Sequence, residues 1–221
     1  MPSAMTREEF ARLANVSRET EPRLQAYAVL LNKWNSVINL VSASTLQDDP
    51  WRRHFWDSAQ LAGHIAPRHR VILDVGSGAG FPGLVLAILD GRPAVHLCES
   101  DRRKATFLRE AARATATAVT VHNCRVEELD LAGVDLITAR AVAPVGAILE
   151  LCERFLGAET QLLLLKGRQV HNELTEAAKT WNMQTVLHPS RSDDSGFVLQ
   201  IEKVARHDRR QTGPIAGATR S

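Results

Sequence analysis

The spacing of apolar residues changes character near residue 70. Through residues 6–66, apolar side chains recur at three- and four-residue steps, which is the period of helices with one buried face. From Val71 onward, short apolar runs alternate with amphipathic stretches. We expect strands at 71–75, 94–99, 119–123, 134–139, 161–166, 183–188 and 197–204, and helices at about 82–89, 102–116, 144–156 and 170–181.

This alternation predicts an α/β fold. We expect a mostly parallel, seven-stranded sheet with helices on both faces, joined by right-handed crossovers. Only a short segment rich in Ser, Asp and Gly separates the last two strands. Because that segment suits a hairpin better than a helical crossover, the final strand is expected to be antiparallel.

The same pattern divides the chain into three parts. Residues 1–66 are expected to form an N-terminal helical cap, and Thr6 with Glu9 forms a capping box for its first helix. Residues 67–206 are expected to form the sheet-containing, cofactor-binding domain. Residues 207–221 have no apolar period, and we expect them to be a disordered tail.

Residues 71–83, VILDVGSGAGFPG, combine a buried strand, a glycine-rich turn and the start of a helix. Glycine is needed where a side chain would collide with a ligand or where the backbone requires a positive φ. Pro82 suits a first helical turn, where its missing N–H is not required. This arrangement lets a backbone approach a nucleotide-like cofactor closely.

Two cofactors fit this loop. From Gly78 it matches the G-x-G-x-x-G pattern of dinucleotide-binding proteins, with Glu99 available to a ribose. From Asp74 it is acid-x-Gly-x-Gly-x-Gly, which resembles the first motif of S-adenosylmethionine methyltransferases. Asp74 would repel a pyrophosphate but attract the cationic amino-acid end of S-adenosylmethionine, directly or through water. The charge favours S-adenosylmethionine, and an NAD-binding oxidoreductase is the less favoured alternative.

Ligands of such sheets bind beyond the carboxyl ends of the strands. Glu99 ends the second expected strand, where its carboxylate would accept hydrogen bonds from both ribose hydroxyls. Val126 and Glu127 follow the third strand, where an adenine would lie. Val126 is expected to pack on the ring, and Glu127 or nearby backbone to bond its edge.

Two cations stand at the same edge of the sheet. Arg140 ends the fourth strand, and it either contacts cofactor or substrate phosphate or forms an internal salt bridge with Asp74, Glu99 or Asp135. Lys166 ends the fifth strand, and it is either a phosphate or base contact or an edge lysine whose ammonium extends to water.

Composition narrows the function classes. Of 221 residues, 44% are apolar and 24% charged, as in an ordinary soluble protein. No apolar run approaches the length of a membrane span, so we expect no membrane partner and a cytoplasmic location. Three widely spaced cysteines predict free thiols and no metal site. A net charge of +2 does not by itself indicate a nucleic-acid partner.

Several motifs occur in an order similar to that of the RsmG (GidB) family, bacterial enzymes that methylate N7 of a guanine in small-subunit ribosomal RNA. The most diagnostic are residues 53–58 (RHFWDS) ahead of residues 74–83 (DVGSGAGFPG). Ala79 stands where the family often has proline, Phe81 where leucine is common, and Glu99 where aspartate is frequent. These changes conserve loop shape or charge. The other matching segments are 33–35, 39–40, 107–109, 125–128, 140–141 and 165–167.

The resemblance implies a Rossmann-like class I methyltransferase that uses S-adenosyl-L-methionine. Its substrate would be a single guanine of 16S rRNA, within the 30S subunit or its assembly intermediate, and we expect a monomer. The alternative is a methyltransferase acting on another RNA or on a small molecule. The cofactor contacts that the family implies are Gly76, Phe81, Val126, Glu127 and Arg140, with Asp74, Gly78 and Glu99 in the usual positions of the class.

Guanine N7 carries an in-plane lone pair and no proton, so methyl transfer to it is a direct displacement. Such a reaction needs alignment and exclusion of water but no general base. We therefore expect His54 to make a structural hydrogen bond to Asp57. The residues expected to hold the base edge and neighbouring phosphates are Arg140 and Lys166, with Arg52 and Arg53. The basic cluster at 102–104 is expected to be a solvated helix face.

Overall fold

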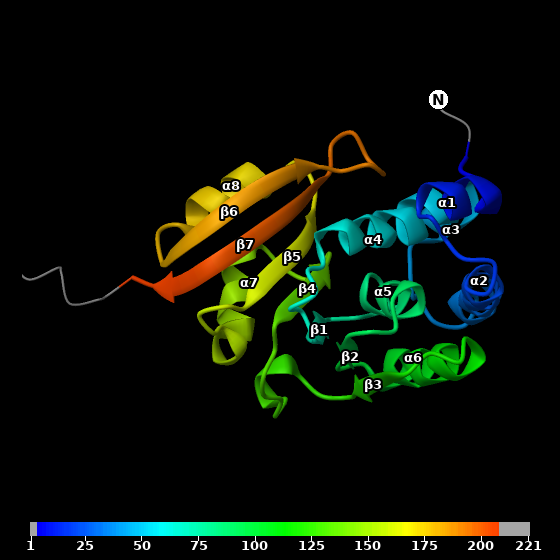
Figure 1. Ribbon diagram of the computed structural model, residues 1–221, viewed down its shortest axis with the longest axis horizontal. Helices are drawn as coiled ribbons and strands as arrows, with labels where there is room; N and C mark the ends of the chain where they lie inside the picture. Colours follow the sequence, from blue (N-terminus) through cyan, green and yellow to red (C-terminus); the bar gives the residue numbers. More distant parts are fainter. Residues whose placement is uncertain (1–3, 208–221) are drawn as a thin grey trace, which may run out of the picture.

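The computed structural model describes residues 4–207, and its centre is one seven-stranded sheet. The strand order is β3-β2-β1-β4-β5-β7-β6, which runs from the lower edge to the upper edge of the sheet in Figure 1. The strand bounds are β1 Val71–Val75, β2 Ala94–Cys98, β3 Val119–His122, β4 Leu136–Arg140, β5 Gln161–Lys166, β6 Trp181–Pro189 and β7 Phe197–Arg206. The expected α/β architecture is confirmed.

The direction of the strands also agrees with the prediction. The neighbours β3, β2, β1, β4 and β5 pair in parallel, and β7 is antiparallel to both β5 and β6. The chain leaves β1 toward β2 on one side and later returns to β4 on the other side. Ligand sites of such sheets form where the strand order reverses in this way, beyond the carboxyl ends of the strands.

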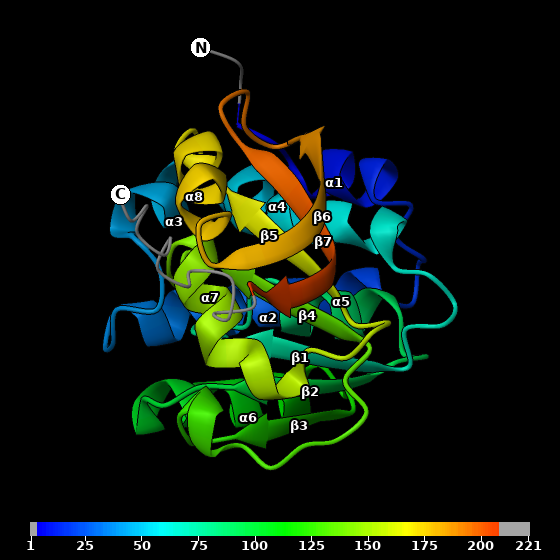
Figure 2. The same cartoon turned by 90° about the vertical axis from the view of Figure 1, so that its left-hand side faces the viewer.

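Helices cover both faces of the sheet, and each face has its own apolar core (Figure 2). One core includes residues of α5 (Gly83–Leu89) and α6 (Arg102–Ala114). The opposite core includes residues of α7 (Val145–Cys152) and α8 (Val170–Ala177). Short 3-10 turns follow β3 at Val126–Glu128 and α7 at Glu153–Phe155. Helix α6 begins where the Asp101 side chain accepts hydrogen bonds from the Arg103 and Lys104 backbone N–H groups.

The N-terminal helices extend the α5–α6 layer. They are α1 (Arg7–Leu13), α2 (Glu21–Asn35) and α3 (Ala43–Asp48), and α2 packs on α5 and α6. The Thr6 hydroxyl caps α1 by accepting from the Glu9 N–H at 3.1 Å, which is one of the two bonds of the expected capping box. Leu24, Tyr27 and Leu31 are buried on one face of α2, at the three- and four-residue steps of the apolar pattern.

The segment that follows α3, residues 51–64, is not one regular α-helix. It begins as a π-helix at Trp51–Trp56, continues through α4 (Asp57–Ala59) and ends as a 3-10 helix at Gln60–His64. A π-helix turns less per residue than an α-helix, so it changes which side chains share a face. This irregularity occurs in the segment that carries the RHFWDS motif.

Two expectations about the ends of the chain stay open. The helical region shares one apolar core with α5 and α6, and the domain boundary near residue 66 stays a prediction. The expected disordered tail falls almost wholly on residues 208–221, outside the described residues. Within residues 4–207, no helix has the length and apolar character needed to cross a membrane.

Candidate active site

A cavity of about 640 Å³ opens at the carboxyl ends of the central strands. Its volume is typical of small-molecule sites. The glycine loop after β1 and the end of β4 form its floor, and the π-helix and the β6–β7 loop form walls. Of the expected site residues, the cavity is lined by Gly76, Gly78, Phe81, Arg140 and Lys166.

The glycine loop has the backbone that its sequence predicts. Gly76, Gly78 and Gly80 all have positive φ, between 55° and 92°. A Cβ at Gly76 would lie 2.8 Å from Cγ2 of Val142, so the loop after β4 also requires glycine there. Because the nearest atom to a Cβ at Gly78 would be 3.8 Å away, the backbone of Gly78 has open space beside it.

Asp74 supports this loop from below. Its side chain is fully buried and does not line the cavity. Oδ1 accepts a hydrogen bond from the Thr138 hydroxyl at 2.7 Å, while Oδ2 has no hydrogen-bond partner among the described residues. Burial raises the pKa of the Asp74 carboxyl to about 6, against the opposing hydrogen bonds of Thr138 and Ser77. The structure does not place Asp74 at the mouth of the loop, where it was expected.

Glu99 also fixes the loop. One carboxylate oxygen accepts the Gly78 N–H at 2.8 Å, and the other accepts the Asp101 N–H at 2.7 Å. The residue is only 7% exposed. It therefore connects the glycine loop to the start of α6, and its expected contact with a ribose stays a prediction.

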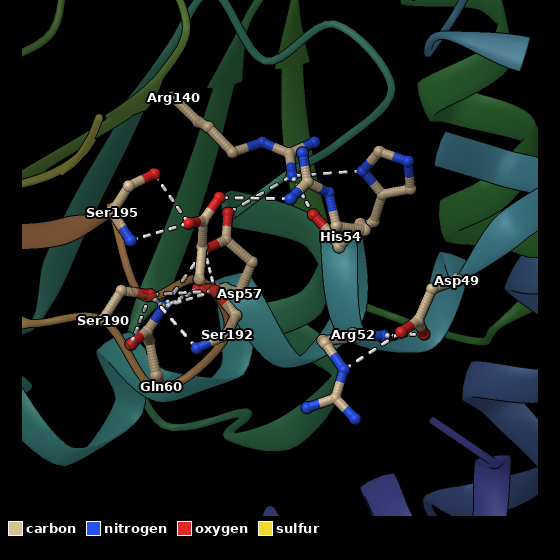
Figure 3. Close-up of polar contacts among 11 residues, drawn as sticks. Asp49, Arg52, His54, Asp57, Gln60, Arg140, Ser190, Ser192 and Ser195 are labelled. Carbon is tan, nitrogen blue, oxygen red and sulfur yellow. Dashed lines mark hydrogen bonds and ion pairs between the residues drawn. The ribbon is translucent and has the colours of Figure 1, made fainter. Parts of the chain in front are cut away.

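Arg140 is the most connected cation of the site. Its Nη1 donates to the Arg53 carbonyl at 3.0 Å and to Nδ1 of His54 at 3.2 Å, and it lies 3.5 Å from Oδ2 of Asp57 (Figure 3). The guanidinium also lies over the Phe81 ring, 4.8 Å from its centroid. Arg140 forms its internal salt bridge with Asp57 of the N-terminal helices, and not with any of the three sheet-domain carboxylates that the sequence suggested.

The predicted His54–Asp57 hydrogen bond is wrong. Nδ1 of His54 faces the Arg140 donor, and Nε2 lies 3.1 Å from the Thr45 hydroxyl. Burial and the positive charges of Arg140 and Arg53 lower the pKa of His54 to about 3. His54 is therefore neutral at physiological pH, with Nδ1 accepting and Nε2 carrying the proton. Arg140 lies between His54 and Asp57 and contacts both, where we had expected the two residues to bond directly.

Lys166 also differs from expectation. Its side chain is 8% exposed, and Nζ donates to the Ala143 carbonyl at 2.6 Å and to Oε2 of Glu173 at 2.8 Å. The same Glu173 oxygen accepts the Val145 N–H at 3.0 Å. Lys166 thus stands at the cavity wall but uses its charge in an internal ion pair that fastens the β4–α7 loop.

The remaining expected residues are spread more widely. Val126 is buried in the α7-side core, and neither it nor Glu127 lines the cavity. Arg52 pairs with Asp49 at 3.0 Å, away from the cavity lining. Arg53 lines the cavity and pairs with Asp193 at 3.1 Å.

The β6–β7 loop forms a wall of the cavity that the sequence patterns do not predict. The Ser192 hydroxyl donates to Oδ1 of Asp57 at 2.6 Å, and the Gln60 amide bonds the same oxygen at 3.1 Å. The Trp56 indole N–H donates to the Arg191 carbonyl at 3.1 Å. No local pattern marks Ser192 as a partner of Asp57, because 135 residues separate them.

These residues suit an S-adenosylmethionine molecule. The glycine loop offers backbone without side chains beside the cavity, and the buried Phe81 ring supports the Arg140 guanidinium at the cavity lining. Arg140 presents positive charge to the same space, which suits the carboxylate of an amino acid. The buried Asp74 lies under the loop, where a phosphate-rich ligand gains nothing from its charge.

Comparison with solved structures supports this fold. The cofactor-bound Rv0187 from MTB superposes with a TM-score of 0.60 at 16% identity, over 91% of this chain and 99% of that one. The M. jannaschii TYW2 in complex with AdoMet gives a TM-score of 0.53 at 14% identity, over 68% and 75%. Identities this low show the class I fold alone.

Sequence comparison is more specific. The family model GidB, rRNA small subunit methyltransferase G, matches residues 20–193. The ribosomal RNA small subunit methyltransferase G of Rhodospirillum rubrum is 54% identical over 202 residues, covering 91% of this chain and all of that protein. That of Granulibacter bethesdensis is 45% identical, over 87% and 90%. The chain therefore belongs to the rRNA small subunit methyltransferase G family.

Proposed function

We propose that this enzyme transfers a methyl group from S-adenosyl-L-methionine to N7 of a single guanine of 16S rRNA. Family membership supports the reaction class and the RNA substrate. The observation that carries the assignment at the site is the shared cavity of Gly76, Gly78, Phe81 and Arg140 at the switch point of the sheet.

The cofactor supplies an electrophilic methyl on a sulfonium, and the acceptor nitrogen has a lone pair but no proton. The protein's task is to align the two reactants and exclude water. The environment of His54 is consistent with a reaction that needs no general base. His54 stays neutral, and its two ring nitrogens bond Arg140 and Thr45. We assign Arg140 the role of holding reactants from the cavity floor.

We assign Lys166 an indirect positioning role. Its ammonium is bonded by Ala143 and Glu173, so its effect reaches the site through the β4–α7 loop. That loop covers Gly76 with Val142. Displacement of this loop would shift Gly76 at the floor of the cavity, although no side chain that contacts the ligand would be removed.

RNA is proposed to approach the open side of the cavity. Lys104 and Arg53 line it there, and neither is deeply buried. Because the net charge is only +2, affinity is expected to need the folded 30S subunit or an assembly intermediate. Most RNA modules that read sequence need an unpaired base, and a guanine displaced from pairing exposes the N7 edge that a deep groove hides. We propose that the enzyme works as a cytoplasmic monomer.

The test uses binding and transfer together. S-adenosylhomocysteine, but not NAD, should bind the wild-type protein in calorimetry, and Arg140→Ala should weaken that binding. Labelled methyl should enter 30S subunits and not 50S subunits. Binding of NAD alone would support the oxidoreductase alternative. Cofactor binding with label only in small molecules or proteins would replace the proposed substrate.

A further inference from the structure

Asp57 contacts two parts of the cavity that lie far apart in the sequence, Arg140 at the end of β4 and Ser192 of the β6–β7 loop. Figure 3 shows its carboxylate between the Arg140 guanidinium and the serines of the β6–β7 loop. Oδ2 lies on the Arg140 side, at 3.5 Å from Nη1. Oδ1 accepts the Ser192 hydroxyl at 2.6 Å and the Gln60 amide at 3.1 Å. The two oxygens thus have separate partners.

Within the part of the chain that the structure describes, the Arg140 guanidinium is hydrogen-bonded through one nitrogen only. All three of its hydrogen bonds within residues 4–207 use Nη1. A guanidinium has five N–H donors, and those on Nε and Nη2 meet no acceptor in this part of the chain. Its face rests on Phe81, and the residue lines the cavity. The geometry leaves the Nε–Nη2 edge available to a ligand with two acceptor atoms.

The β6–β7 loop holds Asp57 in turn. Gln60 accepts the Arg191 N–H at 2.9 Å and donates to the Ser190 hydroxyl at 3.1 Å. Together with the Ser192–Asp57 and Trp56–Arg191 bonds, this fastens the loop to the N-terminal helices. Asp57 itself is 19% exposed, and burial raises its pKa, which Arg140 and Ser192 partly oppose. A carboxylate in this position keeps its orientation only while both sets of partners remain.

We propose that Asp57, fixed by Ser192 of the β6–β7 loop, is a positioning residue for methyl transfer that holds the free edge of Arg140 toward the cofactor. The inference rests on the proposed function and deepens it. It gives the β6–β7 loop, which forms a wall of the cavity, a role in aligning the cofactor. Asp57 does not touch the reactants in this account. Its effect passes through the Arg140 guanidinium.

The experiment compares four variants: Asp57→Asn, Ser192→Ala, the double variant, and Ser195→Ala as a control. Ser195 belongs to the same loop, but among the described residues its hydroxyl bonds only Asp193. For each variant we would measure S-adenosylhomocysteine affinity by calorimetry, and kcat and KM with 30S subunits. Losing a hydrogen bond to a charged group is worth roughly tenfold or more in an equilibrium constant.

Asp57→Asn should therefore lower both kcat and cofactor affinity roughly tenfold, with the KM for 30S subunits unchanged. Ser192→Ala should shift both in the same direction by a smaller factor. It should add nothing in the Asp57→Asn background, because the two residues act through one contact. Ser195→Ala should match the wild type.

Two results would overturn the proposal. One is Asp57→Asn and Ser192→Ala behaving like Ser195→Ala. The other is a loss confined to the KM for 30S subunits, which would make Asp57 a substrate contact. If Asp57→Asn does not fold, Ser192→Ala against Ser195→Ala decides alone. If the wild type binds S-adenosylhomocysteine but methylates no 30S subunit, the proposed substrate fails while the affinity series still tests Asp57.

Discussion

The Thr138 hydroxyl donates to Oδ1 of Asp74 across 2.7 Å, joining the adjacent strands β4 and β1 beneath the glycine loop. Both residues are fully buried. Oδ2 of Asp74 has no hydrogen-bond partner within the described chain, so this hydroxyl supplies much of the carboxylate's stabilisation. A buried carboxylate is sensitive to the loss of a hydrogen-bond donor.

Replacing Thr138 with valine keeps the side-chain shape and removes the donor. We expect the free energy of unfolding to fall by about 1–3 kcal/mol at pH 7.5, because Oδ1 of Asp74 then loses the Thr138 hydroxyl as its donor. Thr138→Ser keeps a hydroxyl and should recover most of the loss. Equal denaturant midpoints for the valine and serine variants would contradict the stabilising role of the bond.

Asp74 should also make stability depend on pH. Its pKa is about 6 in the folded protein against 3.8 for the ordinary carboxyl. Between these values the folded state keeps a proton that the unfolded state has released, so rising pH destabilises the fold. Compared with Asp74→Asn, the wild type should lose up to about 3 kcal/mol from pH 4 to pH 7. Urea unfolding of both proteins across this range measures the difference, and parallel curves would show that Asp74 does not titrate there.

Gly76 and Gly63 form a matched pair for the cofactor loop. A Cβ at Gly76 would lie 2.8 Å from Val142, and its φ is +61°. At Gly63 nothing lies within 4 Å, and the φ is not positive. We expect Gly76→Ala to cost about 1–3 kcal/mol of stability and to abolish S-adenosylhomocysteine binding. Gly63→Ala should be nearly neutral in both calorimetric and unfolding measurements, and a similar loss there would remove the steric explanation.

The ion pair of Lys166 predicts a distinctive salt response. Lys166→Met should lower kcat without changing how 30S affinity varies with salt, because Nζ bonds Glu173 and Ala143. Lys104 lines the cavity from the first turn of α6, where it is half-buried. Lys104→Met should reduce the slope of log affinity against log salt by about one if it contacts a phosphate. A reduced slope for Lys166→Met would restore the direct phosphate contact suggested by the sequence.

Sequence periodicity predicted the sheet well because most strands are local apolar runs, and β1, β2, β4 and β5 each end at or next to a glycine, an acid or a cation. The antiparallel β7 followed from the length and composition of one loop. The glycine loop was equally local, since the three positions that adopt a positive φ, Gly76, Gly78 and Gly80, are all glycines close together in the chain. These features depend on neighbours in the chain.

The side-chain network of the site was not predictable in the same way. The partner of Arg140 is Asp57, 83 residues earlier, and that of Asp57 is Ser192, 135 residues later. The expected hydrogen bond between His54 and Asp57 assumed α-helical spacing. The segment Trp51–Trp56 is a π-helix, which turns less per residue and places the two side chains differently. The ion pair of Lys166 was not predicted, because its partner Glu173 lies on α8 and the sequence pattern pointed only to the end of β5.

The most direct test of the central claim is transfer of labelled methyl from S-adenosyl-L-methionine to 30S subunits from a strain lacking the enzyme. The product is then cleaved by borohydride and aniline, which cuts RNA at N7-methylguanine. We expect scission at a single guanine of 16S rRNA with the wild-type enzyme, and none with Arg140→Ala. Label in the RNA without scission would contradict the N7 assignment, and no label in cofactor-binding protein would contradict ribosomal RNA as the substrate.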